Sequence, residues 1–337
     1  MRKSISREAL LRAAEVAVLG SGASANVEQG TCIVFREERA YTFNGEMGVS
    51  VPAPDLGFVG AVPCAELLAM CQKFNDPILT VDSSNPGQAV FYGAGKKRCG
   101  LTLESEIRLP VGLIEVPETW KALSPAFADA ISVTEKCASN DTNTFVITCL
   151  HITPTGIEAC DNYQAIRYGF DTGVDKNVLC RREHLRCVVG LGMTEFSEST
   201  NWFHFRNADG CVLSLRRFSD AYPDIEFIFK TDGCTPATLP AGLAEVAEKC
   251  SIFGSDKNDT VMVEVKTNAM RITRKTERGF YDEIKDVQYA GPPLMFMINP
   301  KLLTEIGGRS VDCLLSAGKI CVTTAKFQYV ACLGVAS

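Results

Sequence analysis

ITPTGIEACDNYQAIRY, residues 152–168, is the stretch on which the interpretation of this chain depends. An extended run at residues 157–160 is followed by the turn formers Asp161 and Asn162, and a second extended run continues to Tyr168. Asp and Asn interrupt strands because their side chains favour turn conformations. The pattern therefore predicts two strands joined by a polar turn, with the side chains of the turn exposed.

The composition is that of an ordinary globular protein. The chain has 337 residues, of which 46% are hydrophobic and 22% charged, and its formal net charge is −6. A chain of this length buries two or three cores. No apolar run reaches the roughly 18 residues that a membrane span needs, and charged residues interrupt the N-terminal segment where a signal peptide would be apolar. We therefore expect a cytoplasmic protein without a membrane segment.

Fifteen cysteines are scattered along the chain, and none lies in a CxxC pair. Most lie in apolar runs, which favours buried, reduced thiols that pack as small hydrophobic groups. Zinc sites need close pairs of ligands, and the only histidines in the sequence are His151, His184 and His204. We expect no metal site and no other cofactor.

Helices and strands are expected to recur in the same order three times. Helical spacing of apolar residues predicts helices that start near residues 6, 63, 117, 181, 240 and 299, each followed by strand-like runs, the run at 144–150 among them. The starts at Pro63, Arg181 and Asn299 are 118 residues apart. This period is too long for a solenoid. We predict three similar α+β domains, residues 1–116, 117–232 and 233–337, each with two helices packed on antiparallel sheets.

Five segments, in order and across nearly the whole chain, resemble the bacterial type of DNA sliding clamp, the β subunit of DNA polymerase III, in a diverged, phage-like form. The most specific are Tyr-Pro-Asp at 222–224 and Asn-Pro at 299–300. The five segments are residues 41–50 (YTFNGEMGVS), 61–74 (AVPCAELLAMCQKF), 156–167 (GIEACDNYQAIR), 213–225 (LSLRRFSDAYPDI) and 289–303 (YAGPPLMFMINPKLL). The resemblance implies a protein that is not an enzyme. It also implies three-domain subunits that join head to tail, as a homodimer, into a ring that encircles double-stranded DNA and tethers a polymerase.

The resemblance also implies that helices line the hole of the ring and meet DNA without regard to sequence. A negative net charge argues against a general nucleic-acid-binding protein, but a weak attraction inside a ring is compatible with an acidic exterior. Without the resemblance, solvated helix faces would be the simpler interpretation of the basic residues. The loop at residues 21–30, which commonly carries a basic DNA contact in the family, has none here. The candidate DNA contacts are Arg7, Arg12, Lys73, Arg181, Arg182, Arg186, Lys301 and Arg309.

In the family, the turn that corresponds to residues 159–165 forms part of a groove for short peptides of polymerases, clamp loaders and other partners. The family pattern Ala-Thr-Asp-Gly-His-Arg-Leu is replaced here by Ala-Cys-Asp-Asn-Tyr-Gln-Ala. We expect a groove with altered specificity. The alternative is that Cys160 and Val330 belong to a core between domains. The candidate groove residues are Cys160, Asn162, Tyr163, Gln164, Ala165, Val330, Cys332 and Leu333.

Ring closure needs an interface between subunits. By resemblance, the edge strand that contains Cys99, Leu101 and Leu103 meets the third domain of the partner, together with the second helix of the first domain. When two different surfaces of identical subunits pair, and the rotation from one subunit to the next brings the last back to the first, the assembly is a closed ring.

Two enzyme-like patterns in the sequence are weak. Residues 20–25 (GSGASA) mimic a dinucleotide-binding loop, but they follow a helix instead of a strand. Cys160 could serve a thiol hydrolase only with His151 on the preceding strand as its base. The second serious hypothesis is a clamp-shaped interaction protein, or decoy, that binds clamp partners without encircling DNA.

Overall fold

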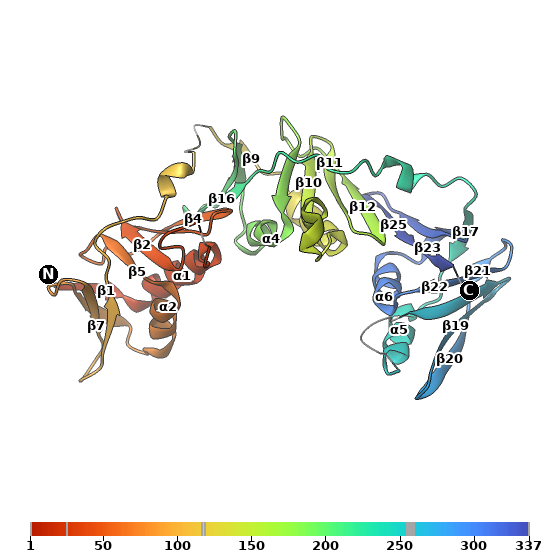
Figure 1. The fold of residues 1–337 in the computed structure, drawn as a ribbon, viewed down its shortest axis with the longest axis horizontal. Coiled ribbons are helices and arrows are strands. Elements are labelled where there is room, and N and C mark those ends of the chain that lie inside the picture. The colour runs from red at the N-terminus through yellow and green to blue at the C-terminus, as the bar shows by residue number, and fades with distance from the viewer. Residues whose placement is uncertain (1, 25, 116, 118, 254–259, 336–337) are drawn as a thin grey trace. The chain divides into compact units, whose positions relative to one another are not determined.

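The computed structural model describes residues 2–24, 26–115, 117, 119–253 and 260–335 (Figure 1). Helices combine with antiparallel sheets, as the α+β prediction requires. The chain divides into two compact units, Met1–Ser132 with Thr172–Ser219, and Val133–Asp171 with Asp220–Ser337. The division into three domains stays a prediction.

The first unit contains two antiparallel sheets. Their strand orders are β1-β6-β7-β8 and β5-β2-β3-β4-β16-β15-β14-β9. The strands of this unit are β1 (Arg2–Ser6), β2 (Cys32–Arg36), β3 (Arg39–Phe43), β4 (Met47–Pro52), β5 (Gly60–Pro63), β6 (Ile78–Asp82), β7 (Gln88–Tyr92), β8 (Arg98–Thr102), β9 (Lys121–Ala122), β13 (Val178–Arg181), β14 (Glu195–Glu198), β15 (Trp202–Arg206) and β16 (Val212–Arg216).

Helices of the first unit cover these sheets, with α1 and α2 packed side by side (Figure 1). Their touching faces bury Leu10 and Leu67 completely. A second core gathers Phe127, Phe203 and Phe205, whose rings meet edge to face or tilted at 4.4 to 6.4 Å. The helices are α1 (Arg7–Ala17), α2 (Cys64–Lys73), α4 (Arg182–Gly190) and the beginning of α3 (Ala126–Thr134), with 3-10 turns η1 (Val18–Gly20) and η2 (Val111–Leu113).

The second unit repeats the plan. Its strands form one sheet with the order β10-β11-β12-β25-β24-β23-β17-β21 and another with the order β20-β19-β18-β22-β26. The strands are β10 (Cys149–Thr153), β11 (Gly156–Cys160), β12 (Gln164–Gly169), β17 (Thr235–Thr238), β18 (Val261–Lys266), β19 (Ala269–Thr276), β20 (Gly279–Asp286), β21 (Gln288–Tyr289), β22 (Leu294–Ile298), β23 (Asp312–Leu315), β24 (Lys319–Thr323), β25 (Phe327–Cys332) and β26 (Gly334–Val335). The helices are α5 (Leu243–Ser251) and α6 (Pro300–Arg309), which pack on each other, with 3-10 segments η3 (Glu135–Cys137), η4 (Thr142–Thr148) and η5 (Glu226–Phe229).

The predicted start positions of four helices are confirmed. The Ser6 hydroxyl accepts a hydrogen bond from the backbone N–H of Ala9 and begins α1. The residues before α2, α4 and α6 are Pro63, Arg181 and Asn299, so the predicted spacing of 118 residues is confirmed.

Two local predictions are wrong. The helix expected from Pro117 begins at Ala126, because residues 121–122 form β9 and pair with β14. The strand expected at residues 144–150 begins only at Cys149, because the Asp141 carboxylate accepts the N–H of Asn143 and starts the 3-10 segment η4.

Sheet pairing continues across both of the predicted domain boundaries. β4, in the predicted first domain, pairs with β16 of the second, with Val49 opposite Leu213. β12, in the predicted second domain, pairs with β25 of the third, with Ile166 opposite Tyr329. Each compact unit therefore joins one predicted domain to part of the predicted second domain.

All fifteen cysteines are free thiols, and most are buried, as the sequence indicated. Among the described helices, none has the length and apolar character of a membrane span.

Candidate functional site

Four of the predicted DNA contacts are exposed on helix surfaces. They are Arg12 on α1, Lys73 on α2, Arg186 on α4 and Lys301 on α6. Arg12 lies 3.7 Å from Glu8, one helical turn earlier, and such exposed pairs hold a side chain weakly. These four cations can therefore reach a phosphate backbone without breaking the fold.

The other four basic residues are engaged by neighbouring protein groups. Arg7 Nη1 donates to the carbonyl of Cys71 at 2.9 Å and ties α1 to α2. Arg181 Nε lies 3.3 Å from a Glu46 carboxylate oxygen. Arg182 is buried. Direct DNA contact by these residues stays a prediction, as it does for the exposed ones.

Arg309 has only 7% of its side chain exposed. Its guanidinium lies 4.5 Å from the centre of the Tyr329 ring, a cation–π contact, and Nη2 faces Glu305 at 3.5 Å. Nη2 also donates to Cys137 Sγ at 3.5 Å. Tyr329 in turn donates its hydroxyl to Gln164 Oε1 at 2.9 Å. Arg309 thus links α6 to the strands that hold the predicted groove.

The polar turn between β11 and β12 has the predicted form. Asp161 Oδ1 accepts the backbone N–H groups of Tyr163 and Gln164 at 2.7 and 2.8 Å. The carbonyl of Tyr163 accepts from the N–H of Cys332 at 2.7 Å, which fixes the turn to β25. Tyr163 is 64% exposed, and Asn162 is exposed beside it, whereas Gln164 is buried.

The strands that flank this turn contribute to an apolar cluster. Cys160, Ala165 and Val330 are buried together with Ile225 and Phe229. Leu333, the last predicted groove residue, is also buried, while Cys332 is exposed. Phe229 of the 3-10 segment η5 is part of this cluster, so Cys160, Ala165 and Val330 are packed inside the protein, while Asn162, Tyr163 and Cys332 remain exposed.

An ion-pair network, which the sequence analysis missed, holds that segment in place. Arg167 donates to Glu158 at 2.5 Å and lies 2.7 Å from Glu226 on η5. The Arg167 guanidinium also lies 5.0 Å from the ring centre of Phe229. Burial opposes ionisation of Glu158, but hydrogen bonds from His151 and Arg167 outweigh it, and the pKa of Glu158 falls below its ordinary value.

The thiol of Cys160 is not arranged for catalysis. Burial raises its pKa, and the hydroxyl of Tyr222 donates to its sulfur at 3.3 Å. His151, its one candidate base, lies 3.1 Å from Glu158 and stacks on Tyr222 with ring centres 4.8 Å apart. Within the described part of the chain, no three metal-ligating side chains form a group that could hold a metal ion. The loop after Gly20 follows a 3-10 turn, and Ala25 lies outside the described residues.

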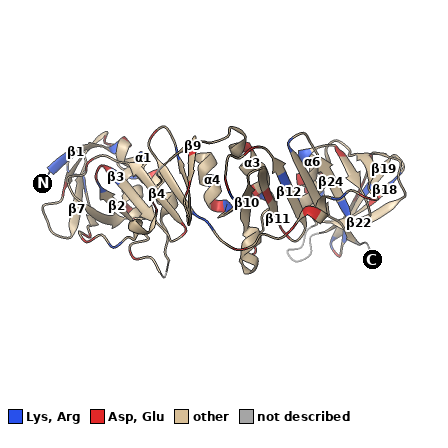
Figure 2. Ribbon diagram, turned by 90° about the horizontal axis from the view of Figure 1, so that it is seen from above, with Lys and Arg blue, Asp and Glu red and all other residues tan. Residues whose placement is uncertain are grey.

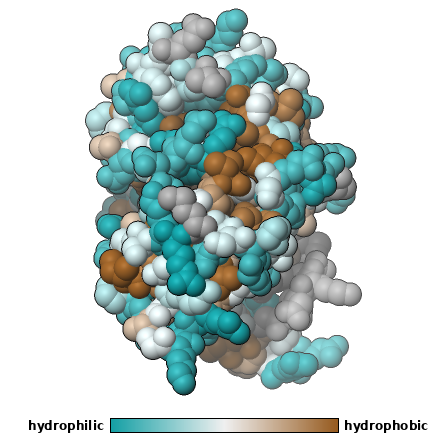
Figure 3. Space-filling view, turned by 90° about the vertical axis from the view of Figure 1, so that its left-hand side faces the viewer, coloured by the Kyte–Doolittle hydropathy of each residue, from teal (hydrophilic) through white to brown (hydrophobic). Residues whose placement is uncertain are grey.

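Two strands end their sheets at the positions where subunits would join. β8 ends the sheet of four strands, and its Leu101 is buried, as is the nearby Leu103, while Cys99 is half-buried. β20 ends a sheet of the second unit, and its Phe280 and Ile284 are 68% and 66% exposed. Figure 3 shows the end of the first unit where β1 and β7 lie, with apolar patches among hydrophilic residues.

Solved structures match this fold along its whole length. The DNA polymerase III β chain of Streptococcus pneumoniae superposes with a TM-score of 0.86 at 16% identity, over 99% of this chain and 100% of that one. A sliding clamp from Bartonella birtlesii bound to griselimycin gives 0.86 at 13% identity, with 100% of both chains covered. The β subunit of Thermotoga maritima gives 0.84 at 12% identity, again with 100% of both covered.

The chain has the sliding-clamp fold.

This result confirms the predicted fold class and the resemblance on which it was based. No protein-family model and no curated protein matches the sequence. The clamp fold is thus preserved here in a sequence that differs from these structures at more than four residues in five.

Proposed function

We propose that the protein is a DNA sliding clamp, a processivity factor without enzymatic activity that encircles double-stranded DNA in the cytoplasm and tethers a replicative polymerase. The clamp fold supports this proposal. The pattern of strand pairing within the chain is the observation that carries it.

Two of three equivalent strand pairs are made within the chain. β4, β12 and β20 recur at intervals of 117 and 115 residues, and β8, β16 and β25 at intervals of 114 and 115. β4 pairs with β16, and β12 pairs with β25, both antiparallel. The third equivalent pair, β20 with β8, is not made within the chain; among the described strands, each of the two is the last strand at one edge of its sheet.

The remaining pair can form between two copies of the chain. β20 of one subunit would join β8 of the next, so unlike surfaces meet and the assembly closes head to tail. The burial of the strands supports this: β4 and β12 are buried along most of their length, whereas β20 alternates between half-buried and exposed residues. We propose a homodimeric ring.

The charge distribution suits loose contact with DNA. Lys and Arg are interspersed with Asp and Glu over the ribbon in Figure 2, and the net charge is −6. A few exposed cations on the helices give a weak attraction that does not depend on base sequence. Retention on DNA would therefore come from the closed ring, with Arg12, Lys73, Arg186 and Lys301 as the phosphate contacts.

Polymerase, clamp loader and other partners would bind through short peptides at the turn between β11 and β12. Tyr163 and Asn162 offer an exposed aromatic and an amide there, and Cys332 lies beside them on β25. The replacement of the family residues at this turn predicts a different peptide preference.

Retention on circular DNA tests the proposal. The protein is placed on a nicked circle, with a clamp loader or by spontaneous ring opening, and the circle is then cut once. We expect the protein to stay on the circle and to leave only after linearisation. No retention, beside a control clamp that loads, would contradict the proposal and favour a decoy that binds clamp partners without DNA. The loop at residues 21–30, without Lys or Arg, is the feature that favours this second candidate.

A further inference from the structure

A cavity of about 720 Å³ lies within the first unit, where β4 pairs with β16. We call it the first-junction cavity; β3, β4 and β16 form its floor, and its wall is formed by Val111, Gly112, Ile114, Glu115, Pro117 and Trp120. This volume is in the range of pockets that hold small molecules or a few peptide side chains.

The wall and floor of the first-junction cavity are largely apolar. Val111, Ile114 and Trp120 line the wall, and Tyr41 and Val212 lie on the floor, each of them half-buried. Apolar side chains that remain partly open to solvent can gain free energy when another apolar group covers them.

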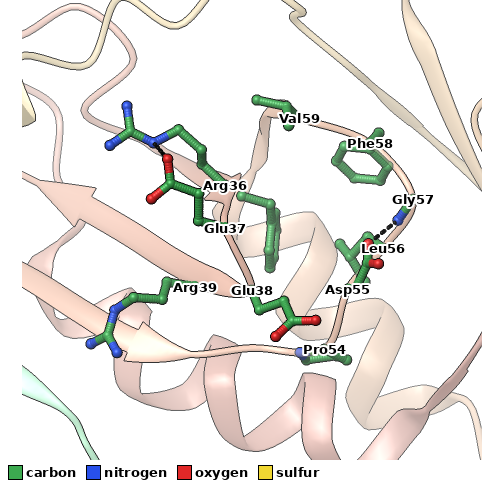
Figure 4. A pocket seen from close by; sticks show the side chains of 11 residues that line it. Arg36, Glu37, Glu38, Arg39, Pro54, Asp55, Leu56, Gly57, Phe58 and Val59 are labelled. Atoms are coloured by element: carbon green, nitrogen blue, oxygen red, sulfur yellow. Dashed lines mark hydrogen bonds and ion pairs between the residues drawn. The ribbon is translucent and has the colours of Figure 1, made fainter.

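Three arginines border the cavity, but they differ in their partners. Arg36 lies 3.4 Å from Glu37, and Arg206 is held by two hydrogen bonds to Glu195. Arg39 has no carboxylate partner among the described residues. Figure 4 shows its side chain directed away from Glu38 on the same hairpin.

Arg39 is nevertheless held in one position. Its Nε donates to Ser50 Oγ at 2.8 Å, and Nη2 donates to the carbonyls of Ser50 and Gly210 at 3.1 and 2.8 Å. Glu115, the acidic residue among the described lining residues, accepts from Asn201 at 3.0 Å instead. The cavity thus contains a fixed cation that is ready to pair with a carboxylate from outside the chain.

The equivalent junction of the second unit shows what completes such a site. There, β12 pairs with β25, and η5 supplies Glu226 to Arg167 and Phe229 to the apolar cluster. A carboxylate and an aromatic ring three residues apart thus satisfy an arginine and fill the space above the paired strands. Among the described lining residues of the first-junction cavity, no carboxylate and aromatic ring stand three residues apart; Val111 and Ile114 pack there against the apolar cluster that contains Phe43 and Trp202.

We propose that the first-junction cavity is a second docking site, distinct from the turn at Tyr163, for a short segment of a partner protein that carries a carboxylate and an aromatic side chain three residues apart. The carboxylate pairs with Arg39, and the aromatic ring covers Trp120 and Ile114. A clamp with this site can hold two partners at once on one subunit.

The probe for this site is the acetylated, amidated heptapeptide DIEFIFK, the sequence of residues 224–230 of this chain. Trp120 lines the cavity, and the other tryptophan, Trp202, is buried, so fluorescence reports occupation of the cavity. We expect a saturable change in fluorescence with DIEFIFK, and at least tenfold weaker binding of NIQFIFK, which keeps both aromatic rings but has no carboxylate. Trp120→Phe should remove the signal.

Variants locate the binding. Arg39→Gln should weaken DIEFIFK binding about tenfold, whereas Arg36→Gln, which removes a cation that already has a partner, should change it less than twofold. Tyr163→Ala should leave it unchanged, and thermal unfolding checks that each variant is folded. Equal binding of both probes, no saturable signal, or a loss caused by Tyr163→Ala but not by Arg39→Gln would overturn the proposal. None of these outcomes depends on ring formation.

Discussion

At the scale of single residues, the buried arginine of α6 is a structural group. Arg309→Ala removes the cation–π contact with Tyr329 and leaves Glu305 with only its 4.0 Å contact to Lys136. We expect the free energy of unfolding to fall by roughly 2 kcal/mol, measured as a shift of the urea midpoint. Arg12→Ala, on an exposed part of α1, should change it by less than about 0.5 kcal/mol. Equal effects of the two substitutions would contradict this role for Arg309.

His204 makes stability depend on pH. It is fully buried between Ser199 Oγ at 3.2 Å and Ser214 Oγ at 2.9 Å, and burial lowers its pKa to about 4. The unfolded chain binds this proton near pH 6.5 and the folded one does not. The stabilisation is therefore complete above pH 6.5 and is lost, up to roughly 3 kcal/mol, as pH falls toward 4.

His204→Asn tests this prediction. The variant cannot take up the proton, so its stability should fall less than that of the wild type between pH 7 and pH 4.5. Urea unfolding at the two pH values measures the difference. The same pH dependence in both proteins would show that other groups cause it.

Residues whose partners are close in sequence could be predicted, and those with distant partners could not. Ser6, Asn299 and Asp161 each bond to an N–H two or three residues away, so a local pattern is enough. Arg309 meets Cys137 and Tyr329, and only the fold brings these together. Its interpretation as a DNA contact rested on helix position, which does not reveal burial.

At the scale of elements, the turn between β11 and β12 depends on one carboxylate. Asp161→Ala removes the acceptor for two backbone N–H groups, so we expect a loss of about 1 kcal/mol in stability. The amides of Tyr163 and Gln164 should also exchange hydrogen faster. Asp161→Asn keeps an acceptor oxygen and serves as the control. Unchanged exchange in the alanine variant would show that the link to Cys332 is enough to hold the turn.

Elements with a local sequence signal could be predicted, even where no side chain caps the helix, as before α2 and α4, but elements made by a neighbour could not. The helix starts 118 residues apart carry local signals. The strand β9 is two residues long and exists because β14 lies beside it. The first-junction cavity was not predicted either, because its floor combines β4 with β16, two segments that are about 160 residues apart in sequence.

At the scale of the whole molecule, the exposed edge of β20 should control assembly. Phe280→Asp with Ile284→Asp places two charges on this edge, where pairing with β8 of the next subunit would bury them. We expect wild type to sediment as a dimer at micromolar concentration, and the double variant as a monomer that circular DNA no longer retains. Met295→Asp, at an exposed position of β22 in the same sheet, is the matched control. A double variant that sediments like the wild type would exclude this interface.

The repeated order of helices could be predicted from the sequence, but the pairing of strands across the predicted domain boundaries could not. Helix spacing alone indicated three similar domains. The pairing of β4 with β16 and of β12 with β25 joins strands about 160 residues apart, and no local pattern specifies such partners. The two compact units of the chain reflect that pairing.

The same pairing also determines where a closed ring would yield to mechanical load. The β4–β16 and β12–β25 seams are each bridged by covalent backbone as well as by hydrogen bonds. A seam between β20 and the β8 of another subunit has only non-covalent bonds. Under tension this seam between subunits would rupture before either internal seam, because no covalent bond crosses it. A DNA duplex could therefore enter a closed ring at this position.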